Sequence, residues 1–260
     1  MAEHLAGIGE AAAETAKTRE TVRGRLRVNV DPLFSRVVLS PKLSAFLLQN
    51  PHMELRLETR DRLADLVSDG FDLAVRFGEP APSALIVRRI LDARILTVAS
   101  PIYVERQGRP ARPQDLASAN HQCIRAIDTS TGRPFEWEFR RGKEPVSVAV
   151  NGRLTVSDSG TKLGACLAGF GVAQVIDLGL EHHVRSGALI NLFPDWSDER
   201  FPLYVYYASR NHVPAKVRKF IDFIVDSLGT ESGAGAHEKS TAKRSAKRNA
   251  PSAVAIAGSS

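Results

Sequence analysis

Apolar residues recur along the chain with two spacings, period two and period three to four. Residues 26–30 alternate apolar and polar side chains as a strand does, and Asp31 and Pro32 then begin a helix with Asp31 as its N-cap. Pro51 lies beyond the end of this helix. The apolar positions that we expect on one face of the helix are Leu39, Leu43, Phe46 and Leu47.

The same order of strand and helix is then repeated. Leu55 and Leu57 alternate with charged residues in a second strand, a second helix ends at Gly70, and a third strand covers residues 71–77. The apolar residues of the second helix are Leu63, Leu66 and Val67. This strand–helix alternation predicts a parallel sheet with right-handed crossovers.

The middle of the chain predicts a second α/β unit that runs to about Pro202. Two apolar strands, around residues 85–91 and 95–99, precede it. The expected elements of the unit, in order, are a short helix after Pro101, a helix start at 113–116, a strand at 123–127, strands near 135–139 and 146–156, a helix at 159–168, and a short strand after the turn at 169–172.

The closing segment contains a strand at 203–208 and a helix that begins at Pro214. Both are so apolar that they must cover a sheet that already exists. The apolar stripe of the helix consists of Val217, Phe220, Ile221, Ile224, Val225 and Leu228. Returning the chain to its first unit gives two lobes joined by two crossing strands, near residues 97–101 and 200–204.

Composition and charge fit a globular protein of one large or two small domains, with 260 residues, 43% apolar and 25% charged. The net charge of +6 is uneven: residues 231–260 carry five Lys/Arg and two Glu, residues 1–24 carry three Lys/Arg and four Glu, and the body holds the remaining +4. That excess is weaker than the dense basic face of a DNA-binding domain. Residues 230–260, rich in Gly, Ser, Ala and Lys, predict a disordered basic tail.

The cysteines, the first residues and the lengths of the apolar runs indicate in which cellular compartment the protein works. Cys123 and Cys166 lie in apolar stretches without metal-ligand spacing, which indicates buried free thiols, a regulatory disulfide being the alternative. The first residues carry acids where a signal peptide needs an apolar core, and no apolar run approaches the roughly 18 residues of a transmembrane helix. We therefore expect a cytoplasmic protein.

The motifs of common enzymes are missing from the sequence. No GxSxG, P-loop, HExxH or paired catalytic carboxylates occur, and Gly169-Phe170-Gly171 lacks the third glycine of a dinucleotide fingerprint. His182-His183 has no metal-ligand spacing and is expected on a helix surface. We expect no catalytic residues, no metal and no cofactor.

Eight segments, in order, resemble the effector-binding domain of LysR-type transcriptional regulators. They span about residues 20–228, and the most specific is Asp61–Gly78. The others are Gly24–Val28 with Leu39–Leu43 and Asn50-Pro51, Ala99–Tyr103, Pro113–Leu116, Gly152–Leu154, Leu167–Val172, Phe193–Trp196 and Lys216–Phe223.

The resemblance implies an α/β, two-lobed periplasmic-binding-protein-like fold of type 2, each lobe a mixed sheet flanked by helices, with two crossover strands. It divides the chain into lobe I at 25–98 and 203–229, lobe II at 99–202, the end of a linker helix at 1–24, and the tail. The family also carries an N-terminal winged helix-turn-helix, and none precedes residue 24 here. A truncated chain, a misassigned start and a free-standing sensor are the three explanations.

Ligands of doubly wound sheets bind at the carboxyl ends of strands, where helix N-termini face the cleft. Two such strand ends, at residues 31–35 and 156–161, predict the effector site, with residues 76–77 and 125–129 completing its walls. The candidate residues are Asp31, Leu33, Phe34, Ser35, Arg76, Phe77, Arg125, Asp128, Thr129, Ser157, Asp158, Ser159 and Thr161.

Each of these polar residues has a structural alternative. Asp31 stands where the family often has a small hydroxyl residue. A carboxylate there predicts an effector that is neutral or that carries an amine or several hydroxyl groups. The alternative is that Asp31 only caps its helix. Ser157, Ser159 and Thr161 bind ligand or cap the next helix. Arg76 is a cation of the cleft or an ion-pair partner of Asp72 or Glu79.

The expected function is a small-molecule sensor in a homodimer or tetramer whose lobe movement changes how attached DNA-binding domains sit on an operator. By resemblance, helices at about 41–49 and 217–228 pair antiparallel with the second lobe of another subunit. DNA would be read only by a helix-turn-helix outside this chain, with weak phosphate contacts from the basic tail. A transport solute-binding protein, a stand-alone sensor that pairs with full-length relatives, and an α/β transferase or deaminase-like enzyme are the rival interpretations.

Overall fold

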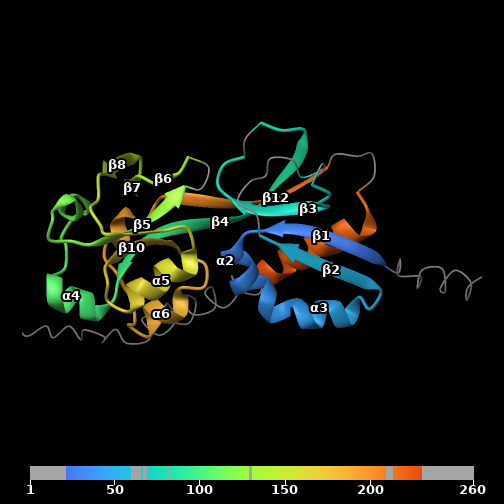
Figure 1. Ribbon diagram of the computed structural model, residues 1–260, viewed down its shortest axis with the longest axis horizontal. Coiled ribbons are helices and arrows are strands. Elements are labelled where there is room, and N and C mark those ends of the chain that lie inside the picture. Colours follow the sequence, from blue (N-terminus) through green and yellow to red (C-terminus); the bar gives the residue numbers. More distant parts are fainter. Residues whose placement is uncertain are drawn as a thin grey trace, which may run out of the picture.

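Two long antiparallel strands, β4 (Leu85–Ala99) and β12 (Arg200–Ala208), run side by side through the middle of the molecule and join two α/β lobes (Figure 1). The computed structural model describes residues 22–59, 66, 69–80, 82–128, 131–208 and 213–229. The main sheet has the strand order β2-β1-β3-β12-β4-β10-β5-β6.

In the first lobe, β1 (Gly24–Val30) lies between β2 (Met53–Glu58) and β3 (Leu73–Phe77) and is parallel to both. β12 then pairs antiparallel with β3. The sheet is therefore mixed, and its antiparallel strand comes from the end of the chain. This confirms the return of the chain to its first unit that the apolar closing segment predicted.

Two helical segments cover this sheet. The first runs from α2 (Pro32–Phe34) through a π turn (Ser35–Leu39) and a 3-10 turn (Ser40–Lys42) into α3 (Leu43–Gln49). The second is the helix over residues 215–229. Phe46 of α3 stacks on Phe223 of that helix, with ring centroids 4.3 Å apart, and the two helices share one core with β1.

The second lobe contains a larger set of short elements. They are α4 (Pro101–Gln107), a 3-10 turn (Pro113–Ala117), β5 (Cys123–Asp128), β6 (Arg133–Pro134), β7 (Trp137–Arg141), β8 (Glu144–Val148), β9 (Leu154–Val156), α5 (Ser159–Leu167), β10 (Val172–Ile176), α6 (Glu181–Arg185), β11 (Ile190–Asn191) and a 3-10 turn (Pro194–Trp196). β7 and β8 form a separate hairpin. Cys123 and Cys166 are buried free thiols, as predicted, and burial raises the pKa of each to about 12.

One strand, β4, belongs to both lobes. Its residues up to Arg94 pair with β12, whereas Ile95 to Val98 pair with β10 and the last residues pair with β11. The change of partner falls between Arg94 and Ile95, and β12 begins opposite it at Arg200. These two strands connect the lobes.

Three predictions about single elements were wrong. The two strands expected at 85–91 and 95–99 form one strand, because pairing with β12 keeps the polar residues between them extended. The strand expected at 146–156 ends at Val148 and resumes at Leu154. In between, a Cβ on Gly152 would overlap the carbonyl oxygen of Cys123, so only glycine lets the chain pass β5 so closely.

The third concerns the first helix. Leu39 and Phe46 are buried and Leu43 packs against the same core, but Leu47 is 37% exposed. The helix changes its winding at the π and 3-10 turns around Pro41, which lacks the N–H of a regular helix. The altered winding rotates Leu47 off the buried face.

Several predictions concern residues outside the described part of the chain. They are the helix at 1–24, most of the helix that ends at Gly70, and the tail at 230–260. Within the described ranges, no helix has the length and apolar character needed to cross a membrane.

Candidate functional site

The start of α2 is capped by the residue that precedes it. The Asp31 carboxylate accepts hydrogen bonds from the backbone N–H groups of Leu33 (2.9 Å) and Phe34 (3.0 Å), which confirms the predicted N-cap. Burial raises the pKa of Asp31, opposed by these two hydrogen bonds and by the charges of Arg76 and Arg36. The carboxylate is thus already engaged by its own helix.

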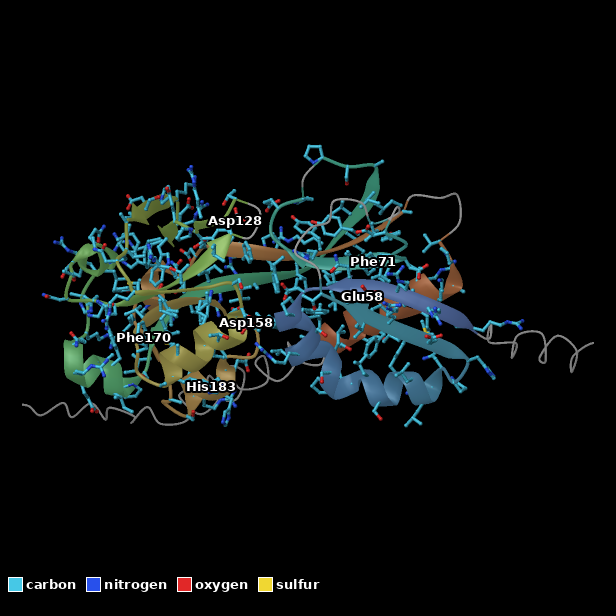
Figure 2. All side chains as sticks on the ribbon, in the orientation of Figure 1. Glu58, Phe71, Asp128, Asp158, Phe170 and His183 are labelled. Atoms are coloured by element: carbon cyan, nitrogen blue, oxygen red, sulfur yellow. The ribbon has the colours of Figure 1, made fainter. Side chains whose placement is uncertain are left out.

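The start of α5, in the second lobe, is built in the same way. The Asp158 carboxylate accepts a hydrogen bond from the backbone N–H of Thr161 at 2.6 Å. This bond, with a smaller contribution from the charge of Arg36, lowers the pKa of Asp158. Figure 2 places Asp158 at the end of α5 that faces the first lobe.

Arg36 connects the two helix starts. It lies in the π turn of the first lobe, and its Nη1 would be 2.5 Å from a Cβ placed on Gly160, in the first turn of α5. The guanidinium therefore rests directly on the backbone of the second lobe. Because any side chain at residue 160 would displace it, the glycine permits this contact.

A cavity of about 390 Å³ lies at this contact and is lined from both lobes. We call it the interlobe cavity. The first lobe supplies Leu33, Arg36 and Val37, and the second lobe supplies Ser159, Gly160, Lys162, Leu163, Gly164, Leu167, Val175, Ile176, Leu178, Gly179, Leu180 and His183. A concave, mostly apolar pocket with a few polar groups is the usual form of a small-molecule site.

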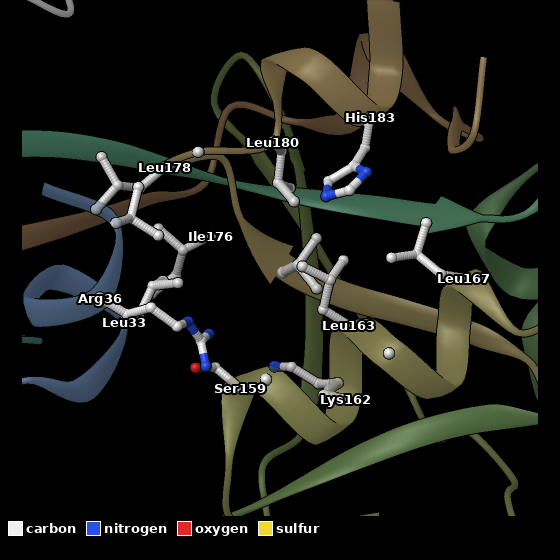
Figure 3. Close-up of a pocket in the computed structure, with 15 residues that line it drawn as sticks. Leu33, Arg36, Ser159, Lys162, Leu163, Leu167, Ile176, Leu178, Leu180 and His183 are labelled. Atoms are coloured by element: carbon white, nitrogen blue, oxygen red, sulfur yellow. The ribbon is translucent and has the colours of Figure 1, made fainter. Parts of the chain in front are cut away.

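The polar groups of the interlobe cavity lie at its two ends. In Figure 3 the Arg36 guanidinium and the Lys162 side chain point toward Ser159 at the start of α5, while the His183 ring enters from α6. The Ser159 hydroxyl is buried and has no hydrogen-bond partner in the described part of the chain. Burial lowers the pKa of Lys162 to about 8.

A smaller cavity of about 170 Å³, which we call the crossover cavity, lies beside the connecting strands. Its lining is Ile95, Ile124, Ala126, Phe135, Glu136, Trp137, Lys162, Gln174, Ile176, Glu199 and Phe201. Lys162 and Ile176 line both cavities. Burial and the nearby charge of Glu138 raise the pKa of Glu199 to about 7.

Of the predicted site residues, Leu33 and Ser159 line the interlobe cavity. Asp31 and Asp158 cap the helices beside it, and Arg76 is close enough to Asp31 to lower its pKa. Phe77 stacks on Phe201, which lines the crossover cavity, with ring centroids 5.8 Å apart.

The other predicted residues line neither cavity. Phe34 is fully buried in the first-lobe core. Asp128 accepts a hydrogen bond from the Thr131 hydroxyl. The remaining residues in this group are Ser35, Arg125, Ser157 and Thr161, and Thr129 lies outside the described residues.

Sequence reasoning missed Arg36, Lys162 and His183. His183 was expected on a helix surface, but it is half-buried and lines the interlobe cavity. Lys162 carried one signal: it is the lone charge in the otherwise uncharged helix Ser159–Leu167. Arg36 carried none, because its importance depends on the approach of the second lobe. No three His, Cys, Asp or Glu side chains in the described ranges come together as a metal site requires.

Residues 19–229 match the family described as the LysR substrate binding domain, which is most of the chain. This chain belongs to the LysR family. An HTH-type transcriptional repressor of Pseudomonas aeruginosa strain UCBPP-PA14 is 30% identical over 206 residues, 78% of this chain and 63% of that protein. The uncharacterized HTH-type regulator YcaN of Escherichia coli is 31% identical over 79% of this chain and 67% of its own length.

Solved LysR structures have the same fold. CrgA, a LysR-type transcriptional regulator from Neisseria meningitidis, superposes with a TM-score of 0.73 at 27% identity, over 87% of this chain and 76% of that one. The full-length Vibrio cholerae virulence activator AphB gives 0.69 at 25% identity, over 86% and 75%. The two-lobed α/β fold is therefore that of the LysR substrate binding domain.

Proposed function

We propose that this chain is the effector-binding and oligomerisation part of a LysR-type transcriptional regulator and that its small-molecule effector binds in the interlobe cavity. The observation that carries the proposal is the lining itself, because three residues of the first lobe and twelve of the second enclose one largely apolar space. A ligand there contacts both lobes at once.

A bridging ligand changes the arrangement of the lobes if it binds one arrangement better than another. The π turn that carries Arg36 and the first turn of α5 are the contacts that such a ligand would add to. The strands β4 and β12 are the covalent connections that allow the lobes to rotate, at Arg94–Ile95 and Glu199–Arg200. The effector shifts a population of lobe arrangements and undergoes no reaction.

The wider function follows from the helix-turn-helix regulators that the chain resembles. We assign DNA recognition to a helix-turn-helix domain outside the described residues and the site of action to the cytoplasm, where bacterial transcription takes place. The boundaries of lobe I (25–98 with 203–229) and lobe II (99–202) belong to the same proposal.

Self-association is assigned to the helices that cover the first lobe. Leu48 of α3 is 79% exposed although it lies next to the packed core, and Leu47 beside it is 37% exposed. Apolar side chains exposed together on a helix are typical of a protein–protein contact. We assign α3 and the helix over 215–229 to a contact with the second lobe of another subunit.

The test is a screen of central and secondary metabolites against the full chain by thermal shift, with hits confirmed by calorimetry. We expect at least one hit, and Leu163→Trp, which fills the interlobe cavity, abolishes its binding. Ile102→Trp is the matched control, because Ile102 is 61% exposed on α4 and lines neither cavity. A hit that binds both variants equally, or a screen with no hit, overturns the proposal.

A further inference from the structure

Lys162 is the one cationic side chain that lines both the interlobe and the crossover cavity. It lies in the first turn of α5 and is half-buried. In the described ranges its ammonium group forms no ion pair, and no carboxylate contributes to its lowered pKa, whose cause is burial alone. An ammonium group held out of water without a counterion destabilises the empty protein.

The acids around Lys162 are engaged elsewhere. Asp158 accepts the hydrogen bond from Thr161 and interacts with Arg36, and Asp31 caps α2. Glu199, across the crossover cavity, interacts with Glu138 and Arg140. The described residues therefore leave one positive charge uncompensated at this end of the interlobe cavity.

Ser159 adds a second, independent observation at the same place. Its buried hydroxyl lacks a hydrogen-bond partner in the described ranges, although buried hydroxyl groups are nearly always paired. Figure 3 shows Ser159 and Lys162 at the same end of the cavity. The ammonium and the hydroxyl group can each donate a hydrogen bond to a ligand. A carboxylate has two oxygens that can accept these two bonds.

The rest of the interlobe cavity is apolar. Its apolar lining consists of Leu33, Val37, Leu163, Leu167, Val175, Ile176, Leu178 and Leu180. A phosphate or a sugar would leave polar oxygens unpaired against the leucine side chains beyond the cationic end. A singly charged acid with an apolar body matches both parts.

We infer that the effector is a monocarboxylate with an apolar body, its carboxylate held by Lys162 and Ser159 and its body enclosed by the leucine-rich part of the interlobe cavity. This inference rests on the proposed function and narrows it to one chemical class. It differs from the expectation drawn from Asp31, which was an effector that is neutral or carries an amine or several hydroxyl groups. The Asp31 carboxylate accepts two backbone hydrogen bonds at the start of α2, so we do not expect it to determine the charge of the ligand.

The test compares octanoate, octanamide and octylamine, which differ only in the head group, by calorimetry on the full chain. We expect octanoate to bind about tenfold tighter than octanamide or more, as a hydrogen-bonded charge does over its neutral analogue. Lys162→Met, or Lys162→Gln if the first variant folds poorly, removes that preference, because it weakens octanoate binding more than octanamide binding. Lys219 is an exposed lysine outside both cavities, and Lys219→Met is the control that should keep the preference for octanoate.

A second pair of variants separates the two cavities that share Lys162. Leu163→Trp fills the interlobe cavity and Ala126→Trp fills the crossover cavity. We expect the first to abolish carboxylate binding and the second to preserve it. The opposite result places the ligand in the crossover cavity and overturns both the inference and the interlobe site of the proposed function.

The same comparisons are made on every ligand from the metabolite screen. A neutral or cationic ligand, or a carboxylate whose affinity is the same in Lys162→Met, overturns the inference and leaves the proposed function standing. A screen that returns no ligand overturns the proposed function itself, so the two failures are distinguishable.

Discussion

The guanidinium of Arg36 in the first lobe lies on Gly160 in the second, so closely that a Cβ on Gly160 would stand 2.5 Å from Nη1. The contact joins a π turn that follows α2 to the first turn of α5, the two helix starts that border the interlobe cavity. At this contact the side chain of one lobe occupies the place that a Cβ of the other lobe would take.

Gly160→Ala tests this contact. The methyl group displaces Arg36, and we expect carboxylate affinity to fall about tenfold, or about 1.4 kcal/mol. Gly229→Ala, at the end of the helix over 215–229, is the control, because its Cβ would meet nothing within 4 Å and the residue lines neither cavity. The control should stabilise the protein by up to about 1 kcal/mol through helix propensity and leave affinity unchanged. Equal affinities of the two variants in calorimetry would contradict the role of the contact.

Asp31 is predicted to act through its cap. Asp31→Ala removes the acceptor for two backbone N–H groups and should lower the free energy of unfolding by about 1 kcal/mol. Asp31→Asn keeps an acceptor oxygen and removes a charge that burial disfavours, so we expect it to be as stable as the wild type at neutral pH. Urea unfolding of the three proteins at pH 7 measures this, and a loss in Asp31→Asn equal to that in Asp31→Ala would show that the charge matters more.

Lys162→Met should stabilise the empty protein at pH 7, by about 0.5–2 kcal/mol, the usual range of single stabilising substitutions. In the native state the pKa of Lys162 is lowered from 10.5 to about 8, so between these values the unfolded chain binds more protons. The stability of the wild type therefore rises with pH across that window relative to the variant. Denaturant unfolding at pH 7 and pH 10 should show the advantage of methionine shrinking, and a constant difference would contradict the lowered pKa.

The pH dependence of carboxylate binding follows from the same group. Affinity should fall as the pH rises through about 8, because Lys162 loses its charge. The other charged or titratable groups that line the two cavities at Lys162 are Arg36, His183, Glu136 and Glu199, and Asp158 lies one turn before it. Glu199, with a pKa of about 7, titrates in a nearby range, so Glu199→Gln is the control and should keep the fall near pH 8.

Leu48 is predicted to mediate self-association. Leu48→Glu puts a charge on the exposed face of α3 and should dissociate the oligomer without changing the stability of the subunit. Sedimentation velocity measures the assembly state. Ile102 of α4 is also apolar and 61% exposed, and Ile102→Glu tests whether α4 belongs to the second-lobe side of this contact. A Leu48→Glu protein that sediments as the same oligomer as the wild type would contradict the assignment of α3.

Periodicity along the chain predicted the order of strands and helices well, because an alternating strand such as 26–30 or an apolar helix stripe such as 217–228 records which side is buried. The same local signal failed at residues 85–99. Arg88, Arg89 and Asp92 interrupt the apolar pattern there, yet β12 pairs along the stretch from Leu85 to Arg94 and Arg89 forms an ion pair with Asp92. A neighbour from more than a hundred residues later in the chain decides this strand.

The two helix starts predicted from the sequence border the interlobe cavity, whereas Arg36, Lys162 and His183, which line it, were not predicted. The two helix starts at Asp31 and Asp158 are local features, and their caps can be read from residue type and position. Whether Lys162 has a counterion, and whether Arg36 touches anything, depends on how the second lobe packs against the first. No spacing along the chain contains that information.

The strand order has a consequence for the synthesis of the protein. β3 pairs with β12, and the helix over 215–229 supplies much of the first core, so the first lobe lacks an inner strand and a covering helix until the ribosome has made nearly every described residue. The second lobe is continuous between its two crossing strands and has its own cores, so it can form earlier. The lobe that begins first is therefore completed last, and its sheet edge at β3 stays open to wrong partners for most of translation.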